Sequence, residues 1–216
     1  MAGNNPMSVP DLQSLEQYNV NRAGQIEGVR QSLYDFQTYP LAGSTQLTFF
    51  QSPIGQNGKT KADTNMTVAG SLPAPQRFLV QSIECHFFPG NAVSKTGGAV
   101  LASNLADCYA VANSGWLDFF IGSKSYLTEA PIGRFPPANG LAGVEALADT
   151  TTAAASRLSI TDYARFGGEP YKLSPPILLV PTQNFNVTLN WPTAVPITAN
   201  ARVGIVMKGI LYRNSQ

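Results

Sequence analysis

The chain has 216 residues, a formal net charge of +1, and a charged fraction of 12%, about half of the ~25% that is usual in soluble proteins. A nearly neutral chain has no electrostatic reason to bind nucleic acid or an anionic membrane surface. The start MAGNNPMSVP lacks a positive segment followed by an apolar run, and no apolar stretch reaches the length of a membrane-spanning helix. We therefore expect neither a secretory signal nor a membrane span.

Residues 1–40 are predicted to form an N-terminal helical or extended arm. Between Asp11 and Leu33, apolar residues recur at three- and four-residue steps, which is typical of an amphipathic helix. Asn19, Asn21 and Gly24 weaken the middle of this helix, so we expect it to be ordered by a partner, either its own β core or another subunit. An aromatic hinge follows, up to Pro40. The candidate subunit contacts in this arm are Leu12, Leu15, Tyr18, Ile26, Val29, Leu33, Phe36 and Tyr39.

The middle of the chain contains short β-strand candidates separated by Gly- and Pro-rich connections. One helix is predicted over Ala99–Ala112, and the Ala- and Thr-rich stretch Ala138–Ser156 is either a short helix or a long surface loop. A hairpin that turns at Gly122–Ser123 joins two of the strand candidates. The predicted strands are Thr45–Gln51, Arg77–Phe88, Gly115–Gly122, Lys124–Ile132, Leu158–Tyr163 and Ile177–Val180.

The last thirty residues contain the clearest strand pattern. Gln183–Trp191 alternates apolar and polar residues, as a half-buried strand does. Ala201–Arg213 is apolar on both faces, which indicates burial on both sides. One face should fill the core with Val203, Ile205, Met207 and Leu211. The opposite face should meet another subunit around a three-fold axis, or else the crossing near Thr64–Leu72, through Val206, Ile210 and Tyr212.

These elements predict an all-β fold. About eight strand candidates with long, uneven connections favour a jelly-roll-like antiparallel β-sandwich over an up-and-down barrel. We find neither an internal repeat nor a low-complexity linker, so residues 41–216 should form a single sandwich domain.

The sequence contains no recognisable catalytic motif. The turn GQNGKT resembles a phosphate-binding loop, but Pro53 stands where the first glycine is required. The one histidine, His86, neighbours Cys85 in a predicted strand, so their side chains point to opposite faces and cannot form a dyad. Cys85 and Cys108 are the only cysteines, and we expect both to be reduced. One His and two Cys are too few for a zinc site unless carboxylates join them.

Two groups of residues leave alternatives open. Paired carboxylates, as in glycoside hydrolases, would have to come from acids such as Glu84, Asp118 and Glu129. A sugar- or base-stacking platform would have to come from Tyr126, Phe135, Tyr163, Phe166 and Tyr171. Structural packing explains both groups more simply, so we predict that the protein is not an enzyme and has no cofactor, metal or small-molecule substrate.

Four stretches of the chain carry a resemblance to a known group of proteins. They are Ser32–Gly55 (SLYDFQTYPLAGSTQLTFFQSPIG), Ala62–Gly90, Leu117–Pro137 and, with a gap, Pro181–Gln216. All four resemble virion proteins of tailed bacteriophages. This resemblance implies a minor capsid or head decoration protein with a jelly-roll-like fold, located in the virion and assembled in the host cytoplasm.

The partners expected from the resemblance are the chain itself, as a homotrimer, and the major capsid protein. The alternatives are a shell, vertex or tail/receptor-binding subunit, or a carbohydrate-binding module or hydrolase unrelated to virions.

Overall fold

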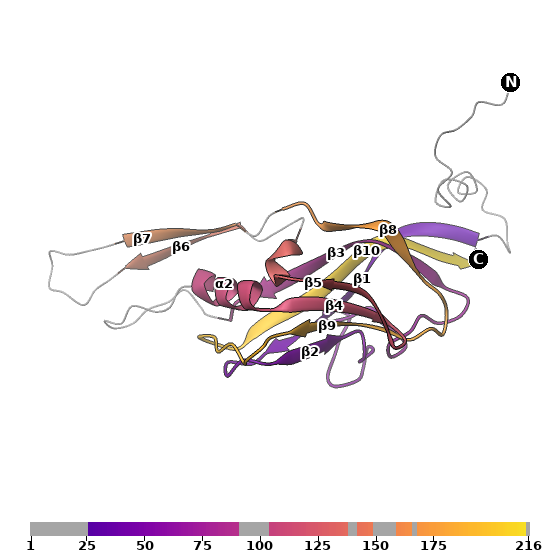
Figure 1. Ribbon diagram of the computed structural model, residues 1–216, viewed down its shortest axis with the longest axis horizontal. Helices are drawn as coiled ribbons and strands as arrows, with labels where there is room; N and C mark the ends of the chain where they lie inside the picture. The colour runs from indigo at the N-terminus through magenta and orange to yellow at the C-terminus, as the bar shows by residue number, and fades with distance from the viewer. Residues whose placement is uncertain (1–25, 91–103, 138–141, 149–158, 166–167, 215–216) are drawn as a thin grey trace, which may run out of the picture.

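The protein is an all-β sandwich, as predicted (Figure 1). The computed structural model describes residues 26–90, 104–137, 142–148, 159–165 and 168–214. The first sheet has the order β1 (Ile26–Tyr39), β10 (Ala201–Asn214), β3 (Arg77–Phe88), β8 (Tyr171–Leu179). The second sheet has the order β2 (Gln46–Phe49), β9 (Phe185–Asn190), β4 (Trp116–Ile121), β5 (Lys124–Glu129). All pairs in both sheets are antiparallel.

The strand pairs are nested around the turn at Gly122–Ser123. Moving outward from that turn, β4 pairs with β5, β3 with β8, β2 with β9, and β1 with β10. These four pairs lie alternately in the second and the first sheet. Two further ladders, β10–β3 and β9–β4, join the pairs within each sheet. The chain therefore follows the path of one long antiparallel hairpin wrapped into two sheets.

The remaining elements are insertions in this path. The helix α2 (Asn104–Ser114) lies between β3 and β4, and the 3-10 helix η2 (Ile132–Arg134) follows β5. Two further strands, β6 (Ala142–Ala148) and β7 (Ser159–Arg165), form a separate antiparallel ribbon that lies beyond the sandwich in Figure 1. None of the helices in the described part of the chain is long and apolar enough to cross a membrane.

One core fills the space between the two sheets. The prediction for the core-facing side of β10 is confirmed, because all four residues predicted to fill the core are buried: Val203, Ile205, Met207 and Leu211. Aromatic side chains supply much of the remaining volume, and each buries a large apolar area. The largest of these lie at Tyr39, Phe49, Phe50, Phe78, Phe119, Phe135 and Phe185.

The helix predicted up to Leu33 is wrong for its last part, since Ile26–Tyr39 is strand β1. Residues 11–25 of that helix lie outside the described residues. The spacing of Val29 and Leu33 fits a strand as well as a helix, and β1 pairs with β10 over its whole length. That long ladder outweighs a helix whose intrinsic propensity is marginal. The arm boundary after residue 40 is therefore also wrong, because β1 belongs to the sandwich.

The other boundaries differ more modestly. The predicted helix Ala99–Ala112 is observed as α2 from Asn104, and residues 99–103 lie outside the described residues. The stretch Ala138–Ser156, predicted as helix or loop, contains strand β6, because β7 supplies a pairing partner. The strand predicted at Ile177–Val180 begins earlier, at Tyr171. The second strand of the predicted hairpin ends at Glu129 instead of Ile132, which lies in η2.

Candidate subunit-binding face

The side of the first sheet that faces away from the core is the candidate site, and we call it the first outer face. Side chains alternate along a strand, and directly opposed residues of neighbouring strands share a face. Because Ile205 and Met207 point into the core, the residues between them and their cross-strand partners point outward. The central rows of this face are Thr38–Arg202–Phe88, Phe36–Gly204–His86, Tyr34–Val206–Glu84 and Ser32–Lys208–Ser82.

An aromatic cluster covers one half of the first outer face. The ring of Phe36 lies directly on Gly204, where an added Cβ would come within 2.0 Å of a ring carbon. The Phe36 centroid is 6.2 Å from Tyr34 and 6.1 Å from each of His86 and Phe88. Such spacings are favourable for aromatic pairs. All four side chains are only half-buried, so the cluster leaves apolar surface accessible.

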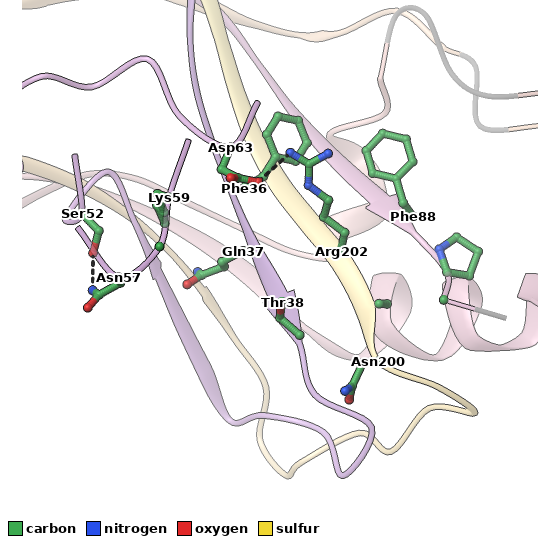
Figure 2. Close-up of a pocket in the computed structure, with 14 residues that line it drawn as sticks. Phe36, Gln37, Thr38, Ser52, Asn57, Lys59, Asp63, Phe88, Asn200 and Arg202 are labelled. Atoms are coloured by element: carbon green, nitrogen blue, oxygen red, sulfur yellow. Dashed lines mark hydrogen bonds and ion pairs between the residues drawn. The ribbon is translucent and has the colours of Figure 1, made fainter. Parts of the chain in front are cut away.

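A cavity of about 740 Å³, lined by both polar and apolar side chains, borders this cluster (Figure 2). Arg202 enters it with its guanidinium carbon 4.5 Å from the centre of the Phe36 ring, a cation–π contact. The same guanidinium donates to the carbonyl of Ala62 and, at 3.1 Å, to Oδ1 of Asp63. Hydrogen bonds from Thr60, and then the charge of Arg202, lower the pKa of Asp63. These contacts place a charged group against an aromatic ring at the cavity and do not bring a nucleophile next to a base.

A buried carboxylate lies in the middle of the first outer face. Glu84 is 1% exposed, although its strand position points away from the core. Its Oε1 is 2.5 Å from Nζ of Lys208, and its Oε2 is 3.0 Å from Nε2 of His86. A carboxylate withdrawn from water needs such opposite charge and hydrogen bonding. The side chains of Lys208 and His86 thus hold Glu84 in place.

The free edge of β1 is covered by the segment around Asp63–Asn65. The amide of Phe36 donates to the carbonyl of Asp63 at 2.7 Å, and that of Tyr34 donates to Oδ1 of Asn65 at 3.0 Å. The backbone of Thr64 also forms an isolated antiparallel β-bridge with Asp35 of β1. The crossing near Thr64–Leu72, which was one expected cover for Val206, therefore begins on this edge.

An ion pair fastens this covering segment to the sandwich. Nζ of Lys59 is 2.5 Å from Oδ1 of Asp35, whose side chain is fully buried. Oδ2 of Asp35 accepts a hydrogen bond from the amide of Phe50 at 2.7 Å. Desolvation raises the pKa of Asp35, while Lys59 and the Phe50 amide oppose that rise. The pair therefore links β1, the end of β2 and the segment that follows β2.

The structure places five of the predicted subunit contacts together. They occupy outward positions along β1 and β10: Ile26, Phe36, Val206, Ile210 and Tyr212. Ile26 is 53% exposed, whereas Ile210 is only 9% exposed in the single chain and offers little area to a partner. Val206 and Tyr212 are half-buried.

The other predicted contacts are elsewhere. Leu33 and Tyr39 are buried in the core, so their assignment as subunit contacts was wrong. The hydroxyl of Tyr39 donates to the carbonyl of Val195, and its ring packs against Trp191. Val29 is half-buried and lies opposite Leu211, on the core side of the sheet. Leu12, Leu15 and Tyr18 lie outside the described residues.

Several residues of this face were missed at the sequence level. Extending the two-residue step of the strand pattern would have found Tyr34, beside Phe36, and Arg202 and Lys208, beside Val206. No local pattern points to Glu84 and Phe88, because only the register between β10 and β3 places them on this face.

A second cavity, of about 280 Å³, lies between α2, η2 and the inner side of β3. Cys85 and Cys108 both line it, and no disulfide joins them. Burial raises the pKa of Cys85 to about 12, so its thiol is not a nucleophile near neutral pH. Within the described ranges, no three His, Cys, Asp or Glu side chains gather in a way that would hold a metal ion.

Most of the described carboxylates and aromatics considered for hydrolysis or stacking have structural partners, whereas Tyr126 is exposed. Phe166 and the side chain of Tyr163 lie outside the described residues. Asp118 accepts hydrogen bonds from the side chains of Trp116 and Asn190. Glu129 accepts from Arg134 and from the hydroxyl of Tyr171, whose ring packs on Phe135. No protein-family model matches the chain, and comparison with curated proteins and with solved structures gives no match.

Proposed function

We propose that the protein is a structural subunit of a tailed-bacteriophage particle that attaches to the capsid shell through its first outer face, without catalysis. The composition of that face carries the proposal. A sheet that faces water normally alternates apolar residues inward with polar residues outward. Here the outward positions of β1, β10 and β3 include Tyr34, Phe36, Val206 and Phe88, all half-buried in the single chain. Apolar outward positions of this kind are typical of protein–protein interfaces.

The path of the chain supports the same class of protein. Four nested antiparallel strand pairs wrapped into two four-stranded sheets support the proposal that the sandwich is an eight-stranded jelly roll. Jelly rolls occur in viral capsid proteins, and also in lectins and cupins. Because a fold alone does not determine function, the proposal also needs the outer face and the resemblance to phage virion proteins.

The proposed partners are the major capsid protein and further copies of the chain around a three-fold axis. Val206 lies at the centre of the face, with the aromatic cluster on one side and Lys208 on the other. Desolvated contacts near the centre of an interface carry most of its binding energy. We therefore expect Val206 to be among the residues that are fully covered in the particle.

Val206→Asp tests this proposal. The change should preserve the fold, because Val206 is only half-buried, and abolish attachment, because it places an unpaired charge in the contact. The matched control is Tyr126→Asp, an exposed aromatic residue on β5 of the second sheet. Thermal unfolding checks the fold, and co-sedimentation with particles that lack the protein measures attachment. A Val206→Asp protein that still sediments with particles contradicts the proposal.

The nested strand pairs favour a second candidate, a jelly-roll subunit of the shell or vertex itself. The number of copies in purified particles separates a vertex or tail subunit from a decoration or shell protein. A decoration or shell protein should be present in hundreds of copies, on the order expected for a surface lattice, and a vertex or tail protein in few. If the protein decorates the shell, particles that lack it should keep an intact but weaker shell. If the protein is the shell subunit, no shell should form without it.

A further inference from the structure

A groove of about 660 Å³ opens on the first outer face, at the end away from the aromatic cluster. It exists because β8 leaves the sheet for a short distance. Ile177 pairs with Val80 and Lys172 with Ser82, so four residues of β8 span the place of one residue of β3. Pro176 lies in this bulge and lines the groove.

Three cations from three different strands line the groove: Arg30 of β1, Lys208 of β10 and Lys172 of β8. Among the described residues, Arg30 has no carboxylate partner. Lys208 pairs with Glu84, and an ammonium group has three donors, so it retains donors for another acceptor.

The third cation is held weakly. Lys172 pairs with Glu169, but their side chains are 68% and 73% exposed, and exposed pairs of this kind contribute little. The hydroxyl-bearing side chains of Ser32 and Ser82 and the amide side chains of Gln31 and Gln81 also line the groove, beside the apolar side chains of Leu173 and the two prolines. The groove therefore combines apolar surface with positive charge that the chain itself does not fully neutralise.

We infer that this groove binds an acidic peptide segment of the partner subunit. The inference rests on the proposed function, since the groove continues the same face. Carboxylates accept strong, charge-assisted hydrogen bonds from guanidinium and ammonium groups. The groove lies one row from Tyr34 and Val206, so an extended segment that alternates acidic and apolar residues matches both parts of the surface.

A nucleic acid fits the groove less well. Single-stranded nucleic acids bind where a positive groove is combined with aromatic side chains that stack on the bases. None of the residues that line this groove is aromatic. The chain also carries a net charge of only +1, which gives little long-range attraction to a polyanion.

The experiment uses the full chain and a fluorescent synthetic peptide of alternating Glu and Val, with a Gln–Val peptide as the neutral probe. Fluorescence anisotropy should show binding of the Glu peptide only, and affinity should fall as salt rises. Arg30→Glu should weaken binding roughly tenfold or more, the expected loss for a charged hydrogen bond. Lys124→Glu, the same charge change on β5 of the other sheet, should leave binding unchanged.

Equal binding of the two peptides, no binding of either, or equal losses for Arg30→Glu and Lys124→Glu would overturn the inference. Tighter binding of an oligothymidylate probe would replace the acidic peptide with a nucleic acid. Peptide binding is measured without particles, so its failure is distinguishable from a failure of capsid attachment. Wild-type attachment with no peptide binding would remove the groove from the interface and leave the proposed function standing.

Discussion

The two sheets of the sandwich present different outer faces. On the second sheet, Asn190 is buried and joins a polar network: it accepts from Nε2 of Gln46 at 2.8 Å and donates to Oδ2 of Asp118 at 2.9 Å. Nε1 of Trp116 donates to the same oxygen of Asp118. Further along β9, Oδ1 of Asn186 is buried and has no hydrogen-bond partner among the described residues.

The first outer face has a different composition. It combines half-buried aromatic and aliphatic side chains with cations that the chain neutralises only in part, such as Arg30. Satisfied polar groups make a face stable against water, whereas apolar positions and unpaired charge gain from a partner. On the second sheet, Trp116, Asp118 and Asn190 bond to one another within the chain, whereas the first outer face keeps apolar surface and a cation without a carboxylate partner, so it gains more from contact with a second protein.

The largest expected effect concerns the attachment of the covering segment to β1, at the border of the first outer face. Lys59→Met leaves the fully buried carboxylate of Asp35 without its cation, so unfolding free energy should fall by about 3–5 kcal/mol at neutral pH. The double variant Lys59→Met with Asp35→Asn should lose less unfolding free energy, because it has no buried charge. Denaturant unfolding of the single and double variants measures the difference.

This loss should depend on pH. Burial raises the pKa of Asp35 above 3.8, so the stability that its protonated form provides is lost as pH rises through the raised value. Removing Lys59 raises that pKa further, because Lys59 lowers it in the wild type. The loss from Lys59→Met should therefore shrink as pH falls toward 4. A loss that is constant with pH would show that the ion pair is not its cause.

The next prediction compares the loss of stability from substitutions on the two sides of β10. Ile205→Ala opens a cavity in the core and should lower the unfolding free energy by about 2–5 kcal/mol. Val206→Ala, one residue further and half-buried, should cost less than about 1 kcal/mol in the isolated chain, since less apolar area is uncovered. Equal losses in denaturant unfolding would mean that the outer side of β10 is covered within the chain.

The sequence was sufficient to predict β10 and much of its two-sided character. Alternation at every second residue separated Ile205 from Val206, and the structure places the first in the core and the second on the outer face. The same rule failed on β1, because the positions of Ile26, Val29 and Leu33 also fit a helical stripe. The ladder with β10 decided between the two, and its residues are far away in sequence.

The candidate site was predictable only in part for the same reason. Phe36 was expected to contact a subunit, but its position on Gly204 and beside Arg202 depends on strand register. Glu84 and Lys208 are paired because β3 and β10 are neighbours, which no local pattern reveals. The cationic groove depends on the bulge of β8, where Pro175 and Pro176 interrupt the ladder.

A smaller loss of stability is expected from a change on the side of the second sheet that faces away from the core. Asp118→Ala removes the acceptor shared by Trp116 and Asn190, and leaving such donors unpaired should cost about 1–3 kcal/mol. Capsid attachment of the folded variant should be unchanged, the reverse of the result for Val206→Asp. Thermal unfolding and co-sedimentation on the same samples measure both. Lost attachment with an intact fold would assign the interface to the wrong sheet.

The smallest effect is expected at His86, the one histidine of the chain. His86→Gln keeps a side-chain amide that is able to donate to Oε2 of Glu84, and Lys208 still supplies the positive charge on Oε1. The unfolding free energy should therefore change by about 1 kcal/mol or less, within the net contribution of a single hydrogen bond. Attachment to particles should persist, since no proton transfer is required of this residue. Lys208→Met is the comparison, because it removes the cation from a carboxylate that is 1% exposed and should destabilise the chain clearly more. If His86→Gln instead abolished attachment while the melting temperature stayed the same, the histidine itself would be a contact or a proton donor. The first outer face would then depend on chemistry that shape and charge do not explain.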